Sequence, residues 1–172
     1  MKKITPILFL LSLISCGVQK DSIVDYTNKK KSYTNVIFVM PYRKFETKNY
    51  INNLKEELDK IFASNQKKVE IITFENEKEG LKLNQDSQIQ ETINAKIKED
   101  AKDLLLILRP TNMMFTDGAL QDFEYEIVGI DTSTKKEVWK GEFRVRGQFG
   151  PSTFLKKSAN GIYEELVGKS ML

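Results

Sequence analysis

The sequence predicts a single α/β domain with the element order β-α-β-α-β-β-β-α, in which helices pack on a mixed sheet of about five strands. Three observations predict this fold class. Short apolar runs typical of buried strands alternate with segments whose apolar residues recur at helical spacing. Two later segments alternate apolar and polar residues with a period of two around a turn composition, as in a β-hairpin. Residues 35–172, which follow a polar stretch, are enough for one domain with a hydrophobic core.

The first β-α-β unit opens with Val36–Met40, a continuous apolar run that predicts a buried strand. A helix follows, with Thr47 as a possible N-cap and an end near residue 65. The inner face of this helix is predicted by the spacing of Ile51, Leu54, Leu58, Ile61 and Phe62. Val69–Phe74 is the second predicted strand.

A charged loop over residues 75–86 separates this unit from the second predicted helix. Ser87–Gln90 has the form of a capping box, in which side chains satisfy the first N–H groups of a helix. A narrow apolar stripe continues at helical spacing through Ile89, Ile93 and Ile97. Leu104–Leu108 is the most apolar run of the domain, so we expect it to be the central strand, covered on both faces.

The hairpin is predicted from two alternating segments on either side of a turn at residues 131–136. Their apolar positions are Phe123, Tyr125 and Ile127 in one strand and Trp139, Phe143 and Val145 in the other. Aligning these faces places Arg144 and Arg146 near Glu124 and Asp122, which predicts cross-strand ion pairs. The same carboxylates leave a calcium site or a glycosidase pair open as alternatives. A final helix begins at residues 151–152 and ends near Gly168.

The N-terminus has the layout of a secretory signal over residues 1–15. Lys2 and Lys3 precede an uncharged apolar run that is too short to span a bilayer, which takes about 20 residues. Leu13-Ile14-Ser15-Cys16 resembles the lipobox of bacterial lipoproteins. This resemblance implies cleavage before Cys16 and attachment of a diacylglyceryl group to its thiol, usually followed by acylation of the new amino group. Two or three acyl chains anchor a protein stably to a membrane.

Residues 16–34 are then expected to be the lipidated cysteine and a flexible, polar tether. Gly17 rather than Asp follows the cysteine, which in the enterobacterial sorting scheme favours the outer membrane. Gln19-Lys20-Asp21 also resembles a short signal that exports some Bacteroidota lipoproteins to the cell surface. We therefore expect an outer-membrane anchor and leave open whether the domain faces the periplasm or the outside.

The predicted element order resembles a small α/β domain of several envelope proteins. These are the amino-terminal domain of the Tol-system periplasmic protein, the lipoproteins that activate penicillin-binding proteins, and the curli-secretion channel subunit. Relatives of this kind often carry a hairpin reading D-x-x-T-x-x-x-x-W-x-G, which corresponds here to Asp131, Thr134, Trp139 and Gly141. The resemblance covers about residues 36–167 and implies a fold rather than an activity.

Composition argues against most kinds of catalysis and cofactor binding. The chain has no histidine and one cysteine, so the commonest general base and metal ligand are missing. There is no glycine loop of a standard phosphate-binding type. The chain has 27 basic and 24 acidic residues, so once Lys2 and Lys3 leave with the signal the remaining 25 basic residues nearly balance the acidic ones, which is no footprint for nucleic acid. We expect no catalytic residues, no cofactor and no bound metal.

The strongest candidate for a functional surface lies where the strands end. Parallel crossovers followed by a hairpin place the C-terminal ends of the first, third and fifth predicted strands at one edge. The segments leaving these ends each combine a proline with an aromatic residue, and ligands usually sit at this edge. The alternative is that these side chains fold back onto the core. The candidate partner-binding residues are Tyr42, Arg43, Phe45, Met113, Met114, Phe115 and Phe149.

These observations predict a lipid-anchored envelope protein that acts by protein binding, recruiting, scaffolding or activating a larger envelope complex. A surface-exposed lipoprotein that binds glycan or host protein is the alternative. An envelope hydrolase is the third possibility.

Overall fold

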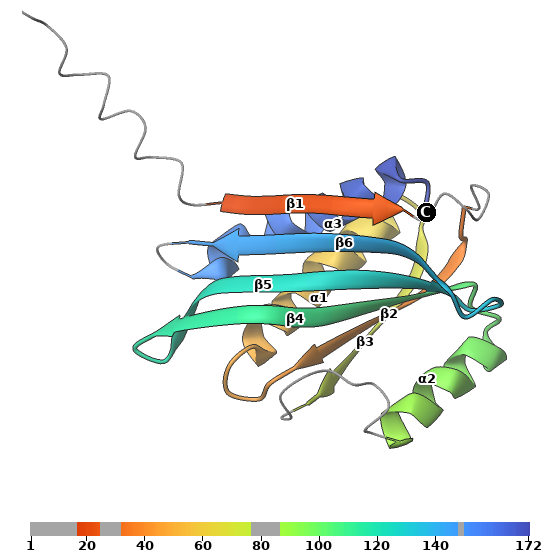
Figure 1. The fold of residues 1–172 in the computed structure, drawn as a ribbon, viewed down its shortest axis with the longest axis horizontal. Helices are drawn as coiled ribbons and strands as arrows, with labels where there is room; N and C mark the ends of the chain where they lie inside the picture. The colour runs from red at the N-terminus through yellow and green to blue at the C-terminus, as the bar shows by residue number, and fades with distance from the viewer. Residues whose placement is uncertain (1–16, 25–31, 77–86, 148–149) are drawn as a thin grey trace, which may run out of the picture.

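The computed structural model describes residues 17–24, 32–76, 87–147 and 150–172. The elements run in the order β1 (Gly17–Val24), β2 (Asn35–Tyr42), α1 (Lys48–Ser64), β3 (Lys68–Glu75), α2 (Ser87–Glu99), β4 (Leu104–Thr116), β5 (Ala119–Asp131), β6 (Glu137–Arg146), the 3₁₀ helix η3 (Pro151–Phe154) and α3 (Leu155–Gly168). The strands form one mixed sheet in the order β1-β6-β5-β4-β2-β3 (Figure 1). The predicted α/β class is confirmed, with six strands in place of about five.

The predicted strand directions are also confirmed. β2 pairs in parallel with both β3 and β4, as expected for strands joined through helices. β4, β5 and β6 are successively antiparallel, so the C-terminal ends of β2, β4 and β6 point the same way (Figure 1). Arg144 lies opposite Glu124 and Arg146 lies opposite Asp122, as the alternation predicts.

The main core fills the space between the sheet and the helices α1 and α3, which lie behind the sheet in Figure 1. Alternation sends Phe123, Tyr125 and Phe143 to this side, where their rings contact one another and Tyr50 of α1. A smaller cluster on the opposite face packs Ile93 of α2 against β2. α2 therefore covers the β2 side of that face, and no described helix covers it over β1, β6 and β5.

The hairpin motif has a structural explanation at each position. The buried Asp131 carboxylate accepts hydrogen bonds from the backbone N–H of Ser133 and of Thr134, both at 2.9 Å, which closes the turn. It also accepts one from the buried Tyr33 hydroxyl at 3.0 Å. Gly141 lies under the Trp139 indole, because a Cβ there would come within 2.7 Å of the ring. The motif therefore corresponds to a turn closed by hydrogen bonds to Asp131 and to a Trp139 ring that packs on Gly141.

Replacing Asp131 with alanine should lower the free energy of unfolding by about 2–4 kcal/mol, because buried donors lose their acceptor. Chemical denaturation of the wild type and the variant measures this change. Ser133→Ala is the matched control, since it removes one hydroxyl donor to the same carboxylate, leaves the backbone and Tyr33 donors in place, and should cost far less. Equal stabilities of Asp131→Ala and wild type would contradict the structural role of the carboxylate.

Two predictions about strands were wrong. Gly17–Val24 was expected to be part of a flexible tether, but it forms β1 and pairs antiparallel with β6. Its Lys20 and Ser22 contact α3 through Glu164 and Glu165, with both closest contacts at 2.5 Å. The strand lacks an apolar stripe for two reasons. One of its faces meets charged side chains of α3, and no described helix covers the other.

The segment from Pro110 to Phe115 was expected to be a loop, but it continues β4 and pairs with β5. Proline is tolerated there because the register shifts next to it, at a bulge between Pro110 and Asn112. β2 pairs with β4 only as far as Ile107, so the proline's missing N–H breaks no ladder on that side. The turn that ends β4 is Asp117-Gly118, and both residues have positive φ, as in a type I′ hairpin turn.

Candidate functional site

The structure brings the described candidate binding residues to one end of the sheet, which we call the hairpin end. It comprises the β4–β5 turn with Met113, Met114 and Phe115, together with the segment of residues 42–48 that joins β2 to α1. The start of α3 lies at this end as well, because α3 follows the C-terminal end of β6. Figure 1 shows the hairpin turn and the end of β6 pointing to the same side.

Tyr42 and Arg43 are half-buried, and both have structural contacts. The Tyr42 ring packs against the main core, and Lys48 Nζ lies 5.8 Å from its centroid. The Arg43 guanidinium pairs with Glu46 at 2.8 Å, and the backbone N–H of Arg43 donates to Thr47 Oγ1 at 2.9 Å. Thr47 therefore occupies the predicted N-cap of α1 but directs its side chain to the preceding loop. Phe45, by contrast, is 88% exposed.

The three large apolar residues of β4 divide between the two faces of the sheet. Met113 pairs with Phe123 and packs against the main core. Met114 pairs with Asp122 on the opposite face and is 44% exposed, and Phe115 is 36% exposed. Folding back onto the core thus accounts for Met113 and Tyr42, whereas Met114 and Phe115 are partly exposed and Phe45 is largely exposed. Cys16 and Phe149 lie outside the described residues.

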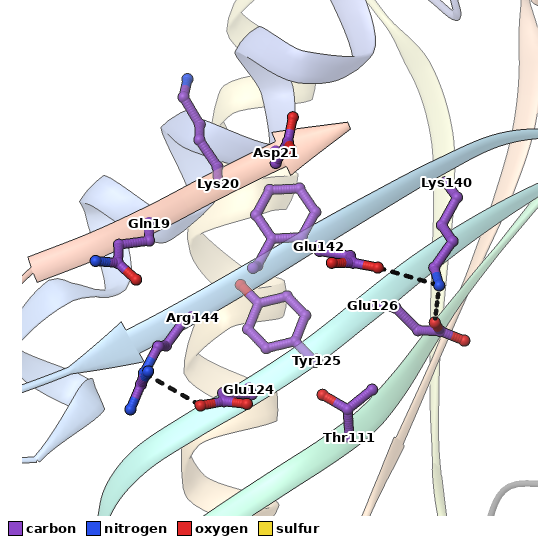
Figure 2. Close-up of a pocket in the computed structure, with 11 residues that line it drawn as sticks. Gln19, Lys20, Asp21, Thr111, Glu124, Tyr125, Glu126, Lys140, Glu142 and Arg144 are labelled. Atoms are coloured by element: carbon purple, nitrogen blue, oxygen red, sulfur yellow. Dashed lines mark ion pairs between the residues drawn. The ribbon is translucent and has the colours of Figure 1, made fainter. Parts of the chain in front are cut away.

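A second candidate is the sheet face that no described helix covers, over β1, β6 and β5. An open depression of about 490 Å³ lies there (Figure 2). Its polar lining comes from β1 (Gln19, Asp21), β5 (Glu124, Glu126), β6 (Lys140, Glu142, Arg144) and Thr111 of β4. Sequence reasoning missed the β1 contribution, because that strand was read as a tether.

An acidic row crosses this face on three neighbouring strands. Asp21 of β1 is paired in register with Glu142 of β6, and Glu142 is paired with Glu126 of β5. Lys140 bridges two of them, with Nζ at 2.7 Å from Glu126 and 3.2 Å from Glu142 (Figure 2). Burial alone would raise the pKa of Glu126, but hydrogen bonds and charge from Lys140 and Arg109 lower it below its usual range. Like charges directly opposite one another disfavour a sheet, so this row suits an additional cation.

The neighbouring residues toward the hairpin end form a satisfied ion-pair group. Arg144 lies 2.6 Å from Asp122 and 3.2 Å from Glu124, and Arg146 lies 3.1 Å from Asp122. Hydrogen bonding to Asp122 raises the pKa of Arg144. The cross-strand ion pairs predicted from alternation are therefore present, and the Asp122 carboxylate is paired with both Arg144 and Arg146. Within the described residues, no group of three or more acidic side chains could hold a metal ion.

Comparison with known proteins identifies the fold but no family. No family model matches the chain, and no curated protein matches it in sequence. Among solved structures, it is similar to a PelC dodecamer from Paraburkholderia phytofirmans, with 13% identity and a TM-score of 0.53 over 91% of this chain and 99% of that chain. A PelC variant from the same organism, also a dodecamer, matches with 12% identity and a TM-score of 0.51 over 90% and 98% of the two chains. At this identity the likeness shows a shared fold alone.

Proposed function

We propose that this protein is a lipid-anchored protein of the outer membrane that acts by binding other proteins, copies of itself included. The lipobox at Leu13–Cys16 supports the anchor. None of the described helices is long and apolar enough to cross a membrane. β1 begins at Gly17, directly after Cys16, so the anchor is joined to the sheet and not to a long tether.

The observation that carries the binding part of the proposal is the acidic row on the uncovered face. Asp21, Glu142 and Glu126 are three acidic residues paired in register across adjacent strands, on a face that no described helix covers. The Asp21 carboxylate also accepts a hydrogen bond from the backbone N–H of Ser22 at 2.8 Å. The side chain of Glu142 is 68% exposed, so a basic side chain of a partner protein can reach it. Such a contact would relieve the repulsion within the row, which gives the partner a defined chemistry.

The same face is less suited to the rival functions. Small-molecule and sugar sites are lined mainly by apolar and aromatic groups, but the two rings at this depression, Tyr125 and Phe143, are buried. The ion pairs of Glu124 and Glu126 leave no obvious free acid and base for a hydrolase. A surface-displayed binder of glycan or host protein and an envelope hydrolase therefore remain second and third to protein binding.

Two likenesses support assembly as the form that this binding takes. The PelC structures with this fold are dodecamers, and the match spans nearly the whole of those chains. The hairpin pattern around Asp131 and Trp139 resembles that of envelope proteins that recruit or activate larger machines. We infer a scaffold that assembles with itself or with a larger envelope complex.

Glu142→Lys tests the binding face, because it should leave stability nearly unchanged while reversing the charge that a partner protein would meet. The new lysine would face Asp21 and Glu126 but would lose the ion pair with Lys140, so the free energy of unfolding should change by less than about 1 kcal/mol. The same change should abolish binding of a basic partner surface. Native mass spectrometry and cross-linking capture from detergent-solubilised envelope measure assembly, and thermal denaturation measures stability.

Glu91→Lys is the matched control, since it makes the same charge change at an exposed position of α2. It should leave both assembly and capture unchanged. Undiminished assembly and capture in the Glu142→Lys protein would reject this face as the binding surface. Release of the protein from whole cells by protease would favour the surface-displayed alternative.

A further inference from the structure

One transverse row of paired residues connects the start of β1 with the hairpin end. Gly17 pairs with Arg146, Arg146 with Asp122, and Asp122 with Met114. Neighbouring strands are about 4.8 Å apart, so roughly 14 Å separates the first residue of β1 from Met114 along this row. The start of β1 and the β4–β5 turn accordingly lie on the same side of the molecule in Figure 1.

The position of the anchor follows from covalent geometry. Cys16 precedes Gly17 by one peptide bond, so their Cα atoms are at most about 3.8 Å apart. Phe115 in turn stands one residue beyond Met114, on the outer side of the row. A lipid on the Cys16 thiol would therefore hold the hairpin end close to the membrane surface.

The exposed apolar residues gather at this same end. Five large hydrophobic side chains are exposed among the described residues, and Phe45, Met114 and Phe115 all belong to the hairpin end. The other two, Ile23 and Val167, lie toward the far ends of β1 and α3. Exposed apolar groups are costly in water but are favoured at the boundary between head groups and acyl chains.

Charge at the hairpin end also suits a membrane surface. Exposed lysines lie next to Phe45 in the chain and in the first turn of α3, and such side chains can bury their stems while keeping the ammonium groups among lipid phosphates. The Lys157 ammonium lies beside Gly17, 3.9 Å from where a Cβ would stand. Of the acidic residues here, Glu46 is already paired with Arg43, and Asp117 in the β4–β5 turn is exposed. The exposed lysines are Lys44, Lys48, Lys156 and Lys157.

We propose that the hairpin end, with Met114 and Phe115 at its tip, docks on the phospholipid surface that holds the lipidated Cys16. The inference rests on the proposed lipid anchor and adds an orientation to it. The head-group layer is roughly 5–8 Å deep on each side of a bilayer, which is comparable to the reach of the hairpin tip beyond the row. The sheet then stands on the membrane, and its acidic face remains free at the side for protein partners.

The test places a fluorescent indole at the hairpin tip of the mature, lipidated protein. Phe115→Trp is reconstituted in phosphatidylethanolamine–phosphatidylglycerol vesicles with and without brominated acyl chains, and the emission of wild-type Trp139 is subtracted. We expect a blue-shifted emission and several-fold quenching by the brominated lipid. Lys136→Trp, at the opposite end of the sheet in the β5–β6 turn, is the matched control and should be neither shifted nor quenched.

The outcomes separate this proposal from the anchor on which it rests. If the protein does not float with vesicles and mass spectrometry finds no lipid on it, both the anchor and the docking are refuted. If the protein floats but the indole at position 115 behaves like the control, only the docking is refuted. A blue shift that depends on protein concentration and is insensitive to brominated lipid would show a second copy covering the hairpin, which also overturns the docking.

Discussion

Replacing Cys16 with serine should abolish attachment of the protein to the membrane, because serine offers no thiol for acylation. A single myristoyl chain gives a membrane association constant of about 10⁴ M⁻¹, so losing two or more chains should reduce partitioning at least about 10⁴-fold. The signal of residues 1–15 should also stay uncleaved, since cleavage in lipoproteins follows lipidation. Labelling with a fatty-acid probe measures acylation, flotation with vesicles measures membrane attachment, and the mass of the product shows whether the signal is cleaved.

The composition of the chain makes this experiment specific. Cys16 is the single cysteine, so thioether-linked label reports on that position alone. Adding Lys136→Cys to the Cys16→Ser protein supplies a thiol at the opposite end of the sheet and should restore neither label nor flotation. Labelling of the Cys16→Ser protein at the wild-type level would reject the lipid anchor.

The parts of the fold that depend on local pattern could be predicted from the sequence. Period-two alternation around residues 131–136 determined the β5–β6 register, and with it the contacts of Arg144 with Asp122 and Glu124. Both strands have one buried and one charged face, so a slip of one residue would invert every side chain. The β-α-β order could be predicted for a similar reason, because buried parallel strands are continuous apolar runs in the sequence.

β1 could not be predicted, because its stabilising contacts are not local and its apolar contact with the core is limited to residues such as Val18. Lys20 and Ser22 contact Glu164 and Glu165, more than 140 positions away in the sequence. The opposite face of the strand is uncovered and carries no apolar stripe. A polar strand of this kind has the composition of a tether until a sheet edge and a helix of suitable charge are known.

The candidate site was predicted in part for a related reason. The connections between the strands predict that the C-terminal ends of β2, β4 and β6 lie at one edge of the sheet. This places Phe45, Met114 and Phe115 at the same end of the molecule. The extension of β4 was hidden by Pro110, which usually ends a strand but here lies beside a bulge. The acidic row was hidden as well, because it needs Asp21 of β1 in register with Glu142.

Replacing Trp139 with alanine should lower the free energy of unfolding by about 3–5 kcal/mol and the melting temperature by roughly 10–20 °C. The side chain is 1% exposed and belongs to the main core, so truncation leaves a large cavity. Its ring lies over Gly141, and its Cβ would lie 3.4 Å from a Cβ at Gly129. Gly129 and Gly141 have no side chains to fill the cavity, and the Phe143 ring is the neighbour that borders it. Thermal and chemical denaturation of the purified domain measure the loss.

Two further substitutions identify packing as the cause. Trp139→Phe should cost far less, since it keeps an aromatic ring and removes an indole N–H that is buried without a hydrogen-bond partner in the described structure. Phe45→Ala also truncates an aromatic side chain, but one that is 88% exposed, and its effect should stay within about 0.5 kcal/mol. A Trp139→Ala protein as stable as Phe45→Ala would mean that the tryptophan faces solvent. The tryptophan of the hairpin motif would then be a binding residue, and the motif could no longer be explained by packing on Gly141.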